Sequence, residues 1–88
     1  MFYQGSIVRG EDVHEGWVSI EWLDPGKNKF SAVKDVRQIE RRILAEGRRG
    51  WLAASERDHT TMHKILVKMG ARQYQESPDE LYFMKEVR

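Results

Sequence analysis

SERDHTTMHKILVKMGA, residues 55–71, is the segment around which the other predicted elements are arranged. Its large apolar side chains recur at i, i+3, i+4 and i+7, which predicts a helix that buries Met62, Ile65, Leu66 and Met69. Asp58 or Thr60 can cap the start of this helix, because a short side-chain oxygen accepts a hydrogen bond from an unpaired N–H of the first turn. Gly70 can adopt the positive φ that ends a helix.

Strand patterns and a second helix surround this stretch. In residues Trp17–Leu23, the apolar side chains of Val18, Ile20 and Trp22 alternate with Trp17, Ser19 and Glu21. This period of two predicts a strand with three apolar side chains on one face. A longer helix is expected to begin at Ser31, as its cap, and to run to about Glu46, with Gly47 as its end. Further strands are expected at Phe2–Arg9, Gly50–Ser55, Ala71–Glu76 and Glu80–Val87.

The predicted element order is ββαβαββ, within one domain of residues 1–88. The polar segment 10–16 is expected to be a loop between the first two strands. The strand-helix-strand passage from Trp17 to Ser55 implies a parallel pair with a right-handed crossover. The last two strands must then join the same sheet in antiparallel orientation. The expected fold class is therefore α/β, with a mixed sheet and two helices.

Composition narrows the classes of function. The 88 residues include 15 basic and 14 acidic side chains, so the net positive field of a dedicated nucleic-acid or membrane-surface protein is missing. There is no cysteine, which excludes disulfides and thiolate metal sites. No apolar run is long enough to span a membrane, and the N-terminus lacks the pattern of a signal peptide. We expect the protein to be cytoplasmic.

Three groups of side chains have both a functional and a structural interpretation. His59 and His63 have the i, i+4 spacing of a metal-binding pair, but no third ligand is evident and exposed helix histidines are the favoured interpretation. Six arginines between residues 37 and 57 could bind nucleic acid, although interspersed glutamates favour a solvated, salt-bridged surface. Of the three tryptophans, two are expected in the core on opposite sheet faces and one at a partner surface.

The order of elements and one short motif resemble the GCN5-related N-acetyltransferase (GNAT) superfamily. The family motif Asn-x-x-Ala-x-x-Phe-Tyr-x-x-x-Gly-Phe corresponds here to His59-x-x-Met62-x-x-Ile65-Leu66-x-x-x-Gly70-Ala71. The resemblance covers about residues 17–88, which are similar to the C-terminal two-thirds of the family fold. The chain therefore looks like a short member without the N-terminal part. Small phage-encoded GNAT-like proteins share the Gly-Ala ending and the leucine before it.

The resemblance implies acetyl-CoA as cofactor. In the family, two central parallel strands splay apart around the pantetheine arm, and the pyrophosphate lies at the N-terminus of the long helix, where free N–H groups favour an anion. The corresponding loop here runs from Gly26 to Ser31. The residues that the resemblance assigns to cofactor binding are Leu23, Gly26, Lys27, Asn28, Ser31, Trp51 and Ala53. The alternative is an ordinary turn with solvated lysines, since the second glycine of the family loop is absent.

Two functions from different classes follow. The first is an N-acyltransferase that acetylates an amine, with a lysine of another protein as acceptor. The second is a non-catalytic GNAT-fold binding protein, such as a phage-encoded host or defence inhibitor or a virion component, in the host cytoplasm. Leu66 favours the second, because it occupies the position of the family's proton-donating tyrosine and cannot donate a proton. Leftover apolar surface also predicts a homodimer.

Overall fold

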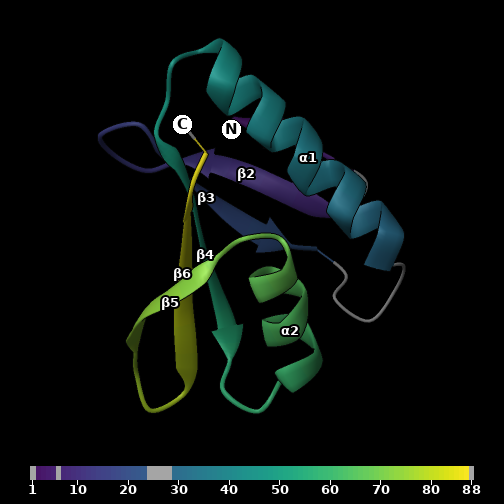
Figure 1. Ribbon diagram of the computed structural model, residues 1–88, viewed down its shortest axis with the longest axis vertical. Helices are drawn as coiled ribbons and strands as arrows, with labels where there is room; N and C mark the ends of the chain where they lie inside the picture. Colours follow the sequence, from purple (N-terminus) through teal and green to yellow (C-terminus); the bar gives the residue numbers. More distant parts are fainter. Residues whose placement is uncertain (1, 6, 24–28, 88) are drawn as a thin grey trace.

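The computed structural model describes residues 2–5, 7–23 and 29–87, without the side chains of residues 29 and 30. Six strands and two helices follow one another as βββαβαββ (Figure 1). Their bounds are β1 Tyr3–Gln4, β2 Val8–Asp12, β3 Trp17–Trp22, α1 Lys29–Ala45, β4 Gly50–Glu56, α2 Thr60–Lys68, β5 Arg72–Glu76 and β6 Glu80–Glu86.

All six strands form one sheet in the order β1-β2-β3-β4-β6-β5. Strands β3 and β4 are parallel and every other neighbouring pair is antiparallel. The predicted mixed α/β sheet, its central parallel pair and its antiparallel closing hairpin are thus confirmed. Helix α1 makes the crossover between the two parallel strands.

The N-terminal region differs from the prediction, because the single strand expected at Phe2–Arg9 is two strands. The chain turns back after β1, and Gly5 N–H donates to Val8 O (2.9 Å). The buried carboxylate of Asp35, on α1, accepts hydrogen bonds from the N–H groups of Ile7 (2.7 Å) and Val8 (3.0 Å). This contact comes from a residue far along the chain, so local patterning did not reveal the turn.

The loop expected at residues 10–16 is also shorter than predicted. Gly10, Glu11 and Asp12 belong to β2 and pair with Ile20, Ser19 and Val18 of β3. Glu11 lies on the sheet face that neither described helix covers, where a charged side chain is tolerated, and Asp12 at the end of the strand pairs with Arg48. The tight connection occupies residues 13–16, where Glu15 (φ 50°) and Gly16 (φ 84°) have left-handed backbone.

Both helices cover the same face of the sheet (Figure 1). Trp51 of β4 donates its indole N–H to Glu40 of α1, whereas Phe83 packs its ring on His63 of α2. Phe83 pairs directly with Ala53, and Ala53 shares a face with Trp51 two residues before it, so the two helices contact one face. A single core cluster lies beneath them. No helix of the described segments is long and apolar enough to cross a membrane.

Helix α1 begins at Lys29, so Ser31 lies inside its first turn instead of capping it. The buried apolar side chains of α1 are Ala32, Val36, Ile39 and Ile43, whereas Leu44 is 54% exposed. Gly47 follows with φ 69°, as predicted for the helix end. Leu44 is exposed because consecutive residues of a helix lie about 100° apart around its axis, which turns it away from the side that buries Ile43.

Helix α2 agrees with the sequence prediction at three of four apolar positions. Met62, Leu66 and Met69 are buried and Gly70 has φ 95°, which confirms the helix, its buried side and its end. The prediction for Ile65 is wrong, since it is only half-buried at the margin of the core. The capping prediction is wrong too: the residue before the helix is His59, and no side chain caps the first turn.

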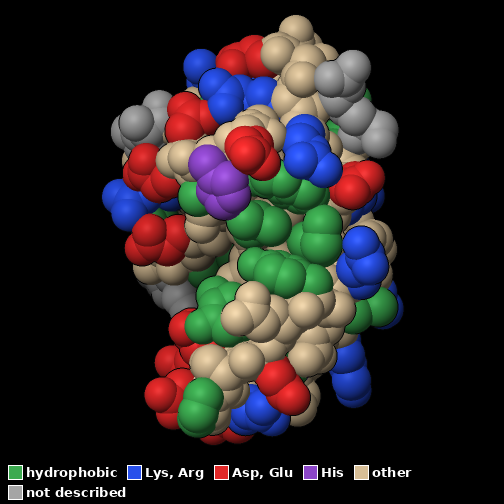
Figure 2. Space-filling model, turned by 90° about the vertical axis from the view of Figure 1, so that its left-hand side faces the viewer, with side chains coloured by type: hydrophobic (Ala, Val, Ile, Leu, Met, Phe, Trp, Pro, Cys, Tyr) green, Lys and Arg blue, Asp and Glu red, His purple; other side chains and the backbone are tan. Residues whose placement is uncertain are grey.

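The other sheet face has no helix over it. Leu52, Tyr82 and Met84 are half-buried there and Tyr74 is 45% exposed, and Figure 2 shows apolar side chains gathered in the middle of this side. Trp17 is buried on this face under the guanidinium of Arg49, 5.1 Å from its ring. A homodimer remains a prediction, and this face is where we would expect it to form.

The three tryptophans divide between these environments. Trp51 and Trp17 are buried on opposite faces, as predicted for two of them. Trp22 is half-buried on the helical side of the sheet, at the end of β3. It lines the pocket described below.

Candidate cofactor and acceptor pocket

The two central strands separate toward their C-terminal ends. Strands β3 and β4 are paired from Trp17 with Gly50 as far as Ile20 with Ala53. Beyond that point β3 continues to Trp22, paired only with β2, and β4 continues to Glu56, paired only with β6. The edges that the two strands turn toward each other therefore have no partner strand there, and such an edge offers backbone hydrogen bonds to a ligand.

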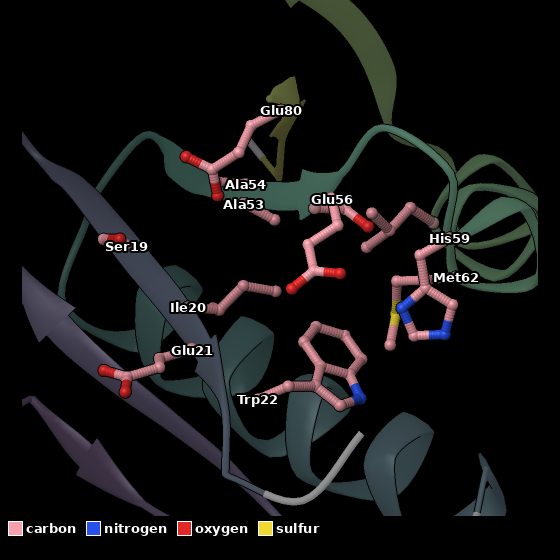
Figure 3. A pocket seen from close by; sticks show the side chains of 12 residues that line it. Ser19, Ile20, Glu21, Trp22, Ala53, Ala54, Glu56, His59, Met62 and Glu80 are labelled. Atoms are coloured by element: carbon pink, nitrogen blue, oxygen red, sulfur yellow. The ribbon is translucent and has the colours of Figure 1, made fainter. Parts of the chain in front are cut away.

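A pocket of about 490 Å³ opens at this separation (Figure 3). It is lined by residues 19–22 of β3, residues 53–56 of β4, His59, Met62 and Leu66 at α2, and Glu80 of β6. Consecutive residues of a strand point to opposite faces of a sheet. Because consecutive residues of both strands line the pocket, it lies between the strands and not over one face.

The inner wall of the pocket is apolar. Ile20, Ala53, Met62 and Leu66 are all buried there. The small side chains of Ala53 and Ala54 leave the backbone of β4 accessible, as a ligand chain bound along the strand would need. Trp22 and His59 turn their rings toward the opening, with Met62 beside His59 (Figure 3).

One polar atom of this wall is buried without a partner. Ser55 is 6% exposed, and within the described segments its hydroxyl has no hydrogen-bond partner. A buried hydroxyl without a partner costs free energy, so it marks a place where a bound molecule can supply the missing hydrogen bond.

Three carboxylates line the pocket, and their surroundings differ. Glu21 accepts a 2.7 Å hydrogen bond from Arg9, and this bond raises the pKa of the Arg9 guanidinium. Among the described residues, Glu80 accepts only a long hydrogen bond, 3.5 Å, from the hydroxyl of Tyr82. Glu56 has neither a hydrogen bond nor an ion pair at its carboxylate within the described part of the chain.

The two helix histidines have structural contacts. His63 is half-buried, and its Nε2 lies 2.9 Å from the carbonyl oxygen of Glu56, with its ring 5.5 Å from that of Phe83. His59 is also half-buried, so the expectation of exposed histidines is wrong for both. No group of three potential metal ligands occurs in segments 2–5, 7–23 and 29–87.

The residues that the sequence assigned to cofactor binding lie in several places. Ala53 lines the pocket, whereas Trp51 lies in the paired part of the strands, opposite Val18. Leu23 follows β3, and its N–H is already bonded to Ile7 O (2.6 Å). Ser31 lies in the first turn of α1. Gly26, Lys27 and Asn28 fall outside the described residues.

Sequence reasoning missed four of the pocket's functional candidates: Trp22, Ser55, Glu56 and Glu80. Trp22 was considered only as one of three tryptophans and Ser55 as the end of a strand. Glu56 was considered as one of the glutamates among the arginines, and Glu80 as the start of the last strand. These four residues share a location in the sheet, because all of them lie at the edge where β3 and β4 separate. That signal can be read only once the register of β3, β4 and β6 is known.

Comparison of the sequence with family models and with curated proteins finds no match. Comparison of the structure with solved structures finds similar chains, and two of them are GNAT proteins. The first, FdhC, is a nucleotide-linked sugar GNAT in its apo form, with TM-score 0.75 and 23% identity over 90% of this chain and 47% of that one. The second is an acetyltransferase of the GNAT family from Bacillus anthracis, with TM-score 0.69 and 15% identity over 91% of this chain and 57% of that one. The chain thus spans about half the length of these relatives.

Proposed function

Because the chain has the GNAT fold, we propose that it is an N-acyltransferase that binds acetyl-CoA and acetylates an amine. The observation that carries this proposal is the separation of β3 and β4 beyond Ile20 and Ala53, with a pocket of about 490 Å³ between them. The pairing stops there although both strands continue, so backbone groups at the centre of a sheet are left for a ligand.

The described residues fit the pantetheine arm of acetyl-CoA. Ala53 and Ala54 keep the wall small, and Met62 and Leu66 give it an apolar lining. The backbone groups left unpaired beyond Ile20 and Ala53 can hydrogen-bond the amide groups of the arm. Bound acetyl-CoA would supply an acetyl group activated as a thioester. The N-terminus of α1 would hold its pyrophosphate, and Lys27 and Lys29 are the lysines next to this end of the helix in the sequence.

The acceptor is an amine, and we propose a lysine side chain of another protein. An amine must lose a proton when it is acylated, and the pocket offers two groups that can accept one, the carboxylate of Glu56 and the imidazole of His59. Figure 3 shows both side chains reaching into the same opening, next to Trp22.

A second candidate function is a GNAT-fold protein that binds a partner without catalysis. Leu66 favours it, because the position that resembles the family's proton-donating tyrosine carries a side chain that is 1% exposed and has no proton to donate. In this case the pocket would be a remnant of the fold, and the open sheet face would be the contact surface.

Calorimetric titration with acetyl-CoA separates the two functions. We expect Lys27→Glu with Lys29→Glu to weaken binding at least tenfold, since each charge-assisted contact to the pyrophosphate contributes roughly 1–3 kcal/mol. The matched control is Lys64→Glu with Lys68→Glu, which makes the same charge change on exposed positions of α2. Absence of binding heat and of a thermal shift with millimolar acetyl-CoA would exclude the enzyme.

A further inference from the structure

We infer that the pocket selects an acceptor amine with a second positive charge close to the reacting one, and that Glu56 and Glu80 hold these charges. The inference deepens the proposed function and depends on it for the acyl transfer. The binding site itself depends only on residues that the structure describes.

The first observation is the register of β4 and β6. Glu56 and Glu80 are direct cross-strand partners, the last pair before the strands end. Like charges directly opposite each other in an antiparallel pair repel and destabilise the sheet. A ligand with two positive charges would remove this repulsion, whereas a neutral or anionic ligand would leave or increase it.

The second observation is that the residues described by the structure supply no compensating cation to the pocket. No lysine or arginine is among the residues described as lining the pocket. Arg57, the nearest arginine in sequence, donates instead to the carboxylate of Glu76 and to Ser77 O. Glu21 already has Arg9 as its partner. The uncompensated charge of the pocket is therefore that of Glu56 and Glu80.

The third observation is independent of the acidic residues. The buried hydroxyl of Ser55, without a partner, lines the same pocket and points to a bound molecule. Trp22 presents its indole beside the Glu56 carboxylate, with Ile20 on the same side (Figure 3). An alkylammonium fits this combination, because an indole attracts a cation and an aliphatic chain packs on Ile20.

Three five-carbon amines test the charge selection without the cofactor. We would titrate the protein with 1,5-diaminopentane, 1-aminopentane and 5-aminopentanoate and follow tryptophan fluorescence. The inference predicts that the diamine binds most tightly and the amino acid most weakly, with about tenfold or more between these two. Equal affinity for the diamine and the amino acid would overturn it.

Variants connect the selectivity to the two carboxylates. Glu56→Gln with Glu80→Gln should reduce the preference for the diamine to less than about twofold, because both anions are gone. The matched control is Glu86→Gln, which neutralises an exposed glutamate of β6 outside the pocket. A preference that persists in the double variant would overturn the inference, provided that its circular dichroism and melting show a folded protein.

Two further experiments are needed. One shows whether the amine belongs to a protein or to a small molecule, and the other tests the amine site separately from the transferase. Lysine peptides flanked by arginine or by glutamate, compared with the diamine, show whether a protein or a small molecule carries the second charge. In either case a preference for the cationic member supports the inference, and a preference for the glutamate-flanked peptide contradicts it. Acetyl-CoA calorimetry is measured apart, so loss of cofactor binding with intact diamine selectivity would exclude the transferase and keep the amine site.

Discussion

The paired and the separated ends of β3 and β4 differ in how their polar groups are satisfied. At the paired end, Glu40 accepts hydrogen bonds from the indole of Trp51 and the ammonium of Lys85, both at 2.8 Å. At the separated end, Ser55 has an unpartnered hydroxyl, and Glu56 faces Glu80 across the strands. The same two strands thus carry a satisfied network at one end and uncompensated groups at the other.

The difference shows where stability and binding are located. A fully hydrogen-bonded buried group holds the sheet together, whereas an unpartnered one costs free energy unless a ligand completes it. The paired end therefore stabilises the fold, and the separated end is a candidate for binding because its groups are poorly satisfied without a ligand.

The largest expected effect tests the paired end through Trp51→Ala. Trp51 is fully buried, so its removal should lower the free energy of unfolding by about 3–5 kcal/mol, measured by denaturant titration. Trp22→Ala is the comparison at the separated end, where the half-buried ring should contribute much less. Equal losses would show that the two ends do not differ in packing.

A smaller effect is expected for Glu40→Gln. The amide cannot pair with the charge of Lys85, and its single carbonyl oxygen replaces an anion that accepts two hydrogen bonds. Because the Glu40 side chain is only 12% exposed, the loss should be about 1–3 kcal/mol in the same titration. Glu46→Gln removes an exposed anion directly after α1 and should change stability much less; a similar loss there would mean that Glu40 acts only as a surface charge.

The smallest effect has the opposite sign. Glu80→Gln removes one of two like charges at the separated end, so the protein without ligand should become more stable by about 0.2–1 kcal/mol. Thermal unfolding at low salt measures this gain, with Glu86→Gln as the control on the same strand. A destabilised Glu80→Gln variant would show that a partner already compensates the carboxylate.

Part of the fold could be predicted because its signals are local. The helical spacing of Met62, Leu66 and Met69 and the glycines after both helices depend on a few neighbouring residues, and the structure confirms them. The parallel pair and the closing hairpin followed from the order of elements and from the handedness of crossovers. Local patterning failed at the N-terminal turn, which the carboxylate of Asp35 holds from α1.

A mixed α/β fold, its two helices and its resemblance to acetyltransferases could be read from the residues alone. Tertiary packing was needed to establish that β3 and β4 stop pairing at Ile20 and Ala53, that the Ser55 hydroxyl has no partner within the described segments and that Glu56 lies opposite Glu80. These two kinds of information differ in their range along the chain. Periodicity and turn residues act within a few positions, whereas strand register depends on the simultaneous packing of segments far apart in the chain.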